Sequence, residues 1–298
     1  MIEKIEKINY LRVGYQKDDI ISEQYTEMLL HFDEAGNIVK QEHFSPDKEI
    51  ISVVLNEYNE QNHLVVTSEF DENEELLQKI EYFYNLNGKV ERQNNFYGEG
   101  SPCYVTRFVY ENNLLIQQEA YVEEDLEGVE KKYFYNDNNQ LIKEIHFNED
   151  GKEQYIFEYS YFENGTLKQT TKIEVLEKDK RTYDYEYDER NNRVKELIYN
   201  YNDELISKSY TKYNDENRVV EVEEEDLNQY KLTQYQYEGE NVIKVSILDK
   251  NKKIISWTEF IYDESGKNKQ LTQYITDEVD PESYRKLYEI KRTYSLDE

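Results

Sequence analysis

Aromatic and polar residues alternate along the chain, and the alternating segments recur with a period of 26 residues. In a first series, an aromatic residue closes a segment just before a polar turn. These first-series anchors are Phe32, Tyr58, Tyr84, Tyr110, Tyr135, Tyr161, Tyr187, Tyr213, Tyr237, Tyr262 and Tyr288. The second-series anchors lie between them and are Phe44, Phe70, Phe96, Tyr121, Phe147, Ile173, Tyr199, Val222, Leu248 and Tyr274. Because alternation with a period of two is typical of half-buried strands, each unit of 26 residues predicts one β-hairpin.

The residues after the first-series anchors have the chemistry of tight turns. Four positions after the anchor, nine of the first ten units have Gly or Asn, which most readily adopt a left-handed backbone. The ten residues are Gly36, Asn62, Gly88, Leu114, Asn139, Gly165, Asn191, Asn217, Asn241 and Gly266. Leu114 is the exception and follows Asn113 in a shortened turn. The unit that begins at Tyr187 is interpreted as slipped by one residue, with Asn192 in the turn position.

Consecutive hairpins are expected to pair edge to edge, because sequential strands usually neighbour one another. The sequence therefore predicts an all-β fold of roughly ten or eleven hairpins in one continuous antiparallel sheet. One face is expected to carry Tyr, Phe, Val, Ile and Leu, and the other Glu, Asp, Lys and Gln. Since a flat ribbon would leave the aromatic face in water, we expect the sheet to curl into a spiral, a solenoid or an open barrel.

The repeats predict one domain over residues 1–298. It would consist of a capping hairpin over 1–31, hairpin repeats over 32–274 and capping strands over 275–298. Near the C-terminus, Asp280 and Pro281 resemble a helix start, but the repeat register favours a strand region from Tyr284 to Tyr294. Pro46, Pro102 and Pro281 all lie in the second kind of turn, where no ladder hydrogen bond is required.

Three segments share a Tyr-x-Tyr-Asp-x-x-Gly pattern or a close variant of it. They are residues 185–194, 260–267 and 31–38. This pattern resembles the bacterial YD repeat, also called the Rhs repeat. The resemblance implies a spiralling antiparallel β ribbon, which in that family often forms a hollow shell around a toxin. Small stand-alone repeat proteins of this appearance also resemble the immunity proteins encoded beside polymorphic toxins.

Composition adds an electrostatic constraint. The 298 residues include 65 acidic and 36 basic ones, a formal net charge of −29, with only 37% hydrophobic residues. Such values are typical of disordered chains, but the 30 tyrosines argue for a folded one. The excess charge disfavours nucleic acid and anionic membranes as partners and favours a basic protein. A single cysteine and a start without signal-peptide features lead us to expect a cytoplasmic protein.

Motifs for catalysis are absent from the sequence. It has no HExxH, Cys/His cluster, P-loop or Gly-x-Ser-x-Gly, so we expect no enzyme activity, no cofactor and no metal. His31, His43 and His146 directly precede anchors and are predicted to point to the solvated polar face. His31 and His43 would suit a metal only if a third ligand were added. Cys103 has no basic neighbour and is expected to be an incidental thiol.

Two acidic runs are the strongest candidates for a binding surface. They are Glu123, Glu124, Asp125 and Glu127 in the first run, and Glu223, Glu224, Glu225 and Asp226 in the second. Both follow second-series anchors and are predicted to be loops on the same sheet edge. Clustered carboxylates beside exposed aliphatic residues can steer and hold a basic partner, although they can also serve only solubility and the blunting of strand edges. Tyr121 and Tyr199 lie near that edge and are further candidates for partner contact.

The leading hypothesis is therefore a non-enzymatic binding scaffold. We expect an immunity protein or antitoxin that neutralises a basic toxin, for example a nuclease, by covering its basic surface. The alternative is a carbohydrate-binding or cell-surface-binding module, because aromatic hairpins can stack on sugars. Against that alternative, the tyrosine positions are those that strand packing requires.

Overall fold

The computed structural model describes residues 4–16, 19–264, 266–276 and 284–297. In this part of the chain there are 22 strands and no helix. The strands are β1 (Lys4–Gln16), β2 (Asp19–Phe32), β3 (Ile38–Phe44), β4 (Ile50–Tyr58), β5 (Leu64–Asp71), β6 (Leu76–Tyr84), β7 (Val90–Phe96), β8 (Tyr104–Glu111), β9 (Leu114–Val122), β10 (Asp125–Tyr135), β11 (Leu141–Phe147), β12 (Glu153–Tyr161), β13 (Leu167–Glu174), β14 (Asp179–Tyr187), β15 (Arg193–Tyr199), β16 (Leu205–Tyr213), β17 (Val219–Asp226), β18 (Tyr230–Glu238), β19 (Asn241–Leu248), β20 (Ile254–Tyr262), β21 (Asn268–Thr276) and β22 (Tyr284–Asp297). The predicted all-β hairpin repeat is confirmed.

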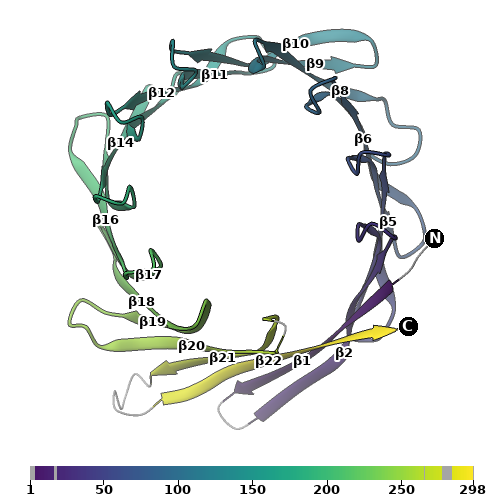
Figure 1. Cartoon of the computed structure of the whole chain (residues 1–298), viewed down its shortest axis with the longest axis vertical. Coiled ribbons are helices and arrows are strands. Elements are labelled where there is room, and N and C mark those ends of the chain that lie inside the picture. The colour runs from purple at the N-terminus through teal and green to yellow at the C-terminus, as the bar shows by residue number, and fades with distance from the viewer. Residues whose placement is uncertain (1–3, 17–18, 265, 277–283, 298) are drawn as a thin grey trace. The chain divides into compact units, whose positions relative to one another are not determined.

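Two compact units divide the chain. Unit 1 comprises residues 1–130 and 289–298, and unit 2 comprises residues 131–288. Within unit 1 each strand from β1 to β9 pairs antiparallel with the next, and within unit 2 the same holds from β11 to β21 (Figure 1). The strands at the two ends of the chain are the longest, with 13 and 14 residues in the first hairpin and 14 in β22. At the other end β22 is a strand, as the repeat register predicts, while Pro281 lies outside the described residues.

A side-chain cap closes most turns. The residue after the anchor is usually Asp or Asn, and its Oδ1 accepts the backbone N–H groups two and four residues later. For example, Asn59 accepts from Gln61 at 3.0 Å and from His63 at 2.9 Å. The same pair of hydrogen bonds forms at Asp33, Asp71, Asn85, Asn136, Asn148, Asp188, Asn200, Asn214 and Asp249. These Asx turns satisfy backbone donors that a tight reversal would otherwise leave unpaired.

The predicted left-handed positions are confirmed in eight of ten turns. Positive φ occurs at Gly36, Asn62, Gly88, Asn139, Gly165, Asn191, Asn217 and Gly266. Two sequence interpretations are wrong. The turn after Tyr187 is not slipped, because Asn191 has φ 62° while Asn192 donates from its side chain to Asp188. Asn241 begins β19, since Gly239 and Glu240 alone form the preceding turn.

β-Bulges break the expected division into an apolar face and a polar face. A register shift occurs between the anchor and the residue before it at most turns, for example at Ser160/Tyr161 and His146/Phe147. An extra residue in one strand reverses which side chains point to which face. Residues an even number of positions apart therefore need not share a face once a bulge lies between them. One face therefore aligns Glu144, Phe157 and Lys172, and the other aligns isoleucines at 145, 156 and 173. The prediction of two chemically distinct faces is wrong.

The prediction that histidines before the anchors are solvated is wrong for His31 and His146, while for His43 it stays a prediction. His31 is buried, with 8% of its surface exposed, and its Nε2 lies 2.6 Å from Glu42 Oε2. His146 pairs with Glu144 and lies 5.2 Å from the Phe157 ring, centroid to centroid. Neither imidazole is a solvated group on a polar face.

Few side chains are deeply buried. Among the described residues, the buried apolar ones are Val105, Ile145, Tyr185, Leu232 and Leu248. A single sheet leaves most strand positions partly exposed, so hydrophobic burial alone supplies less stability than in a layered domain.

Hydrogen bonds from seven of the anchor tyrosines connect a hairpin to the one before it. The hydroxyl of an anchor donates to a backbone carbonyl that lies five or six residues after the preceding first-series anchor. Donor–acceptor distances run from 2.7 Å, for Tyr84 to Leu64 and Tyr161 to Leu141, up to 3.2 Å, for Tyr58 to Ile38. The same bond is made by Tyr110, Tyr213, Tyr237 and Tyr262.

The acceptor carbonyls lie beyond the end of the ladder that joins the two hairpins. The paired positions of β5 with β6 begin at Val66 opposite Glu81, two residues past Leu64. Leu64 pairs with Tyr58 on β4 but has no partner in the ladder with β6, and on that side the Tyr84 hydroxyl donates to its carbonyl. Burial raises the pKa of the Tyr84 and Tyr161 hydroxyls, which keeps them protonated as donors.

We predict that Tyr84→Phe lowers the free energy of unfolding by about 1 kcal/mol, because the Leu64 carbonyl loses its donor. Urea denaturation followed by circular dichroism measures the change. The matched control is Tyr201→Phe, since Tyr201 is 61% exposed and its hydroxyl makes no hydrogen bond within the described residues. Equal effects of the two substitutions would contradict the assignment.

The left-handed turn positions give a second prediction. Asn139 has φ 60°, so Asn139→Val should destabilise the protein by about 1–2 kcal/mol, because a β-branched residue is strained there. Asn139→Gly should lie within about 0.5 kcal/mol of the natural protein. The expected result is a lower urea midpoint for Asn139→Val and an almost unchanged midpoint for Asn139→Gly.

Candidate protein-binding surface

The topology places alternate turns at the same edge of the sheet. Because consecutive strands are antiparallel, the turns after β3, β5, β7 and β9 lie at one edge of unit 1. The turns after β14, β16 and β18 likewise share an edge of unit 2. Neighbouring turns on one edge are two strands apart, about 10 Å.

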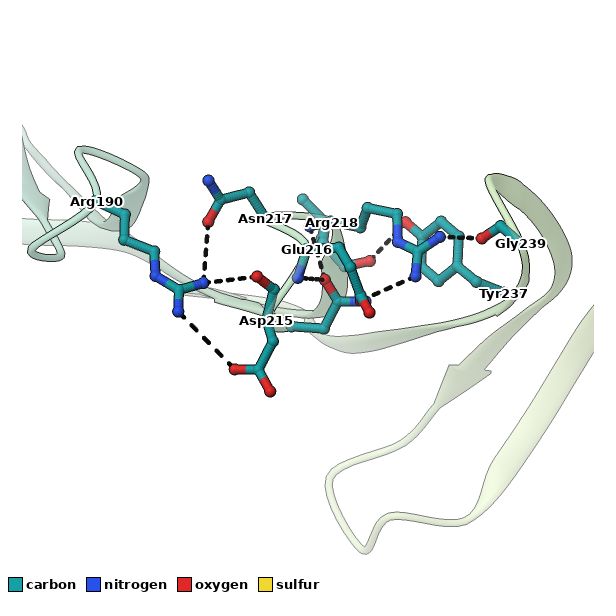
Figure 2. A network of polar contacts seen from close by, with 9 residues as sticks. Arg190, Asp215, Glu216, Asn217, Arg218, Tyr237 and Gly239 are labelled. Carbon is teal, nitrogen blue, oxygen red and sulfur yellow. Dashed lines mark hydrogen bonds and ion pairs between the residues drawn. The ribbon is translucent and has the colours of Figure 1, made fainter.

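The unit 2 edge is cross-linked by two arginines (Figure 2). Arg190 donates to the Asp215 carbonyl at 2.8 Å, and its guanidinium lies 4.0 Å from the carboxylate of the same residue. Arg218 donates to the Gly239 carbonyl and pairs with Glu216 at 2.9 Å. Its guanidinium also lies 4.8 Å from the centroid of the Tyr237 ring. The acidic residues at the centre of this edge are therefore engaged by the protein itself.

The unit 1 edge is different, and we call it the acidic rim. It consists of residues 45–51, 71–77, 97–104 and 123–127. Eleven acidic residues lie there against one basic residue, Lys48. The acids are Asp47, Glu49, Asp71, Glu72, Glu74, Glu75, Glu99, Glu123, Glu124, Asp125 and Glu127. All except the half-buried Asp71 are exposed.

The acidic rim has no internal charge compensation. No rim carboxylate has a cationic nitrogen within 4.0 Å in the part of the chain that the structure describes. Only two of these side chains have a local structural role. Asp71 accepts the backbone N–H groups of Asn73 and Glu75, which hold the pKa of its carboxyl below the ordinary value, the bond from Glu75 most strongly. Glu123 accepts the Cys103 N–H at 2.8 Å.

Apolar side chains are exposed between the acids. Ile51, Tyr97 and Leu126 are 51%, 58% and 59% exposed, and Ile50, Leu77 and Tyr104 are also exposed. The Tyr97 and Tyr104 rings lie 5.8 Å apart, centroid to centroid. A surface that combines unpaired carboxylates with exposed aliphatic and aromatic groups offers both steering and desolvation energy to a basic partner.

The structure separates the two acidic runs that the sequence treats alike. Glu123 and Glu124 form the predicted turn between β9 and β10, but Asp125 and Glu127 lie in β10 and not in a loop. All four belong to the acidic rim. Glu223, Glu224, Glu225 and Asp226 do not form a loop, because all four lie in β17. Two of these carboxylates are already paired, Glu224 with Lys231 at 3.2 Å and Glu225 with Lys208 at 2.7 Å.

The two candidate tyrosines have different surroundings. The Tyr121 hydroxyl donates to Glu119 at 2.8 Å, and the Arg107 guanidinium lies 4.4 Å from its ring centroid. Tyr199 is half-buried, opposite Thr182 on β14. Their roles in partner contact stay predictions.

Sequence reasoning missed three of the four turns that make the acidic rim. The available signal was the spacing of the second series, which places residues 45–51, 71–77 and 97–104 on the same edge as Glu123. The acids in these turns are too common in the chain to single out by composition. Their lack of cationic neighbours depends on which side chains of other strands lie nearby, and only the tertiary structure determines that.

The described residues give little support for a metal site or a reactive cysteine. In the described part of the chain, no group of three His, Cys, Asp or Glu side chains is arranged to hold a metal ion. Burial raises the pKa of the Cys103 thiol, with Glu123 adding to the effect, so little reactive thiolate forms. A search of the described residues finds no helix with the length and hydropathy to cross a membrane.

Comparisons with known proteins identify similar solved structures only. No family model matches the sequence, and no curated protein matches it. The crystal structure of TcdB2-TccC3-Cdc42 matches over 90% of this chain with 11% identity and a TM-score of 0.35. The Photorhabdus luminescens Tc holotoxin pore matches over 91% with 10% identity and a TM-score of 0.34. This chain spans 22% of each of those chains. A porin-like protein from Bacteroides uniformis matches over 99% of this chain and 98% of its own, with 7% identity and a TM-score of 0.34.

Charge pairing gives a prediction that distinguishes the two acidic runs. Glu72→Lys should raise the urea midpoint, because it relieves repulsion in the acidic rim. Glu225→Lys should lower it, because it replaces the carboxylate that lies 2.7 Å from Lys208 Nζ by a second cation. Both shifts should shrink in about 1 M NaCl, where surface charges are screened. A fall in midpoint for Glu72→Lys would show that the rim acids are paired.

Proposed function

We propose that this chain is a non-enzymatic binding scaffold that docks a basic protein on its acidic rim, most simply as an immunity protein or antitoxin against a basic toxin. The observation that carries the proposal is the set of eleven rim acids without a cationic partner in the described residues, interspersed with exposed apolar side chains. In the acidic run of β17, by contrast, internal ion pairs engage Glu224 and Glu225.

The physical mechanism is occlusion. A toxin that acts on nucleic acid needs a basic substrate-binding surface. The rim presents carboxylates on turns whose backbone is held by an Asx cap at Asp71 and by hydrogen bonds between Glu123 and Cys103. Electrostatic attraction would speed encounter, and the exposed Ile51, Tyr97 and Leu126 would lose water on docking. The proposal implies a bound complex in which the substrate surface of the toxin is covered.

The test begins with the product of the gene adjacent to this one in the native host. That product is co-expressed with the chain, and host survival and co-purification are measured. Survival that depends on the chain, together with a basic co-purifying product, is the expected result. An adjacent product that is not toxic or is not bound would overturn the immunity role.

A charge-reversal variant locates the interface. Glu72→Lys, Glu75→Lys, Glu124→Lys and Glu127→Lys together change exposed rim acids whose side chains make no hydrogen bond within the described residues. We predict a loss of affinity of roughly 100-fold or more and a weaker dependence of the dissociation constant on salt. Isothermal titration calorimetry at several salt concentrations measures both quantities.

The matched control makes the same change of charge elsewhere. It combines Asp137→Lys, Glu163→Lys, Glu189→Lys and Glu264→Lys, four exposed acids in turns of unit 2. Affinity should stay within about tenfold of the natural protein, since only long-range attraction is lost. If the control weakens binding as much as the rim variant does, net charge and not the rim holds the partner.

A further inference from the structure

Two arginines face each other on unit 1. Arg92 on β7 is directly opposite Arg107 on β8 in the antiparallel register. Like charges at directly opposite positions destabilise a sheet. In a chain with a net charge of −29, carboxylates to neutralise such a pair are abundant.

Neither arginine is neutralised. In the described residues, no carboxylate oxygen lies within 4.0 Å of the Arg92 or Arg107 guanidinium. The other four arginines with described side chains all have such a partner, namely Arg181, Arg190, Arg193 and Arg218.

The nearby carboxylates are directed elsewhere. Glu119 is opposite Arg107 in the register, but its two oxygens accept from Gln117 at 2.7 Å and from Tyr121 at 2.8 Å. Glu81 pairs with Lys79 at 2.7 Å, and the bond to Lys79 is the main reason why the pKa of its carboxyl is lowered. Arg92 only adds to that effect from a longer distance.

Aromatic rings hold both guanidinium groups in place. The Arg92 guanidinium carbon lies 3.8 Å from the Phe83 ring centroid, and that of Arg107 lies 4.4 Å from the Tyr121 ring centroid. Stacking against a ring occupies the face of a guanidinium and leaves its edge N–H groups available. One of these donors, Arg92 Nε, is buried and has no hydrogen-bond partner.

A cavity of about 670 Å³ adjoins the pair. Arg92 and Arg107 line it together with Phe83, Tyr110, Glu91 and Glu119. Arginine recognises oxyanions through its planar fork of N–H donors. Here a buried donor without a partner, a second guanidinium held against a ring and an adjoining space lie together.

We propose that Arg92 and Arg107 form a binding site for a small oxyanion of the phosphate type. The anion would sit between the two guanidinium edges, accept the buried Arg92 Nε–H and relieve the repulsion between the two cations. Two carboxylates in the wall restrict the site to a compact anion that reaches the arginines without approaching Glu91 or Glu119. This site does not depend on the acidic rim, so either proposal can fail alone.

The first test uses inorganic phosphate on the natural full-length protein. In ¹H–¹⁵N spectra of the arginine side chains, the Arg92 Nε–H resonance should shift progressively between 0 and about 50 mM phosphate, because it gains a charged acceptor. Sodium chloride at equal ionic strength and sodium acetate are run in parallel. A shift with phosphate alone supports the proposal, and a shift with acetate alone assigns the site to carboxylates. No shift beyond that caused by chloride overturns it.

A stability measurement with variants gives a second readout. Without phosphate, Arg92→Gln should raise the urea midpoint, because it removes repulsion from Arg107. Phosphate should raise the midpoint of the natural protein but not that of Arg92→Gln or Arg107→Gln, since a ligand stabilises only the state that binds it. Arg92→Lys should respond to phosphate about tenfold more weakly, because lysine lacks the planar fork. Arg181→Gln, which alters a paired arginine, is the control and should respond as the natural protein does.

The variants also distinguish the site from a structural role. If Arg92 served only to pack on Phe83, Arg92→Gln would lower the midpoint in both buffers. That outcome, or an equal phosphate response in the natural protein and the double variant Arg92→Gln/Arg107→Gln, would overturn the proposal.

Discussion

The hydrogen bond from an anchor tyrosine to a carbonyl of the preceding hairpin recurs in seven repeats and answers one constraint that they share. The ladder between two hairpins stops before the tight turn, and a carbonyl such as that of Leu64 lies beyond its last paired position. The phenol of the next repeat supplies the donor. This explains why the anchor is tyrosine and not phenylalanine in nearly every unit, although packing alone would accept either residue.

The same constraint explains how a chain with so little apolar content folds. Few side chains are deeply buried, so polar contacts that repeat with the sequence carry much of the specificity. Asx caps fix the turns, tyrosine hydroxyls fix the hairpins to one another, and residues such as Arg190 and Arg218 join neighbouring turns. Each contact is modest, but its recurrence along the chain stabilises every hairpin against the next, as in other repeat proteins.

The acidic runs of this protein differ in whether lysines or arginines lie opposite them on neighbouring strands. On β17, Glu224 and Glu225 pair with lysines on the neighbouring strands, so a run that is conspicuous in the sequence is partly compensated. The acidic rim lacks such neighbours and concentrates uncompensated charge with exposed Tyr97 and Leu126. Arg92 and Arg107 are the opposite case, because these two cations have no carboxylate partner within the described residues although the chain is rich in carboxylates. Function is proposed at both places because each group still needs a partner that the described chain does not supply.

The periodic features of this protein were predictable from its sequence. The 26-residue period determined the hairpins, and Gly or Asn at one position determined the left-handed turns, because these depend on local backbone conformation. Tertiary structure decided which side chains meet. Bulges reverse the alternation at the anchors, which buried His31 and mixed the two faces. Register between strands then decided that Glu225 meets Lys208 while the Glu123 run meets no cation. Pairing across strands depends on register, and a one-residue bulge changes that register without leaving a signal in the repeat.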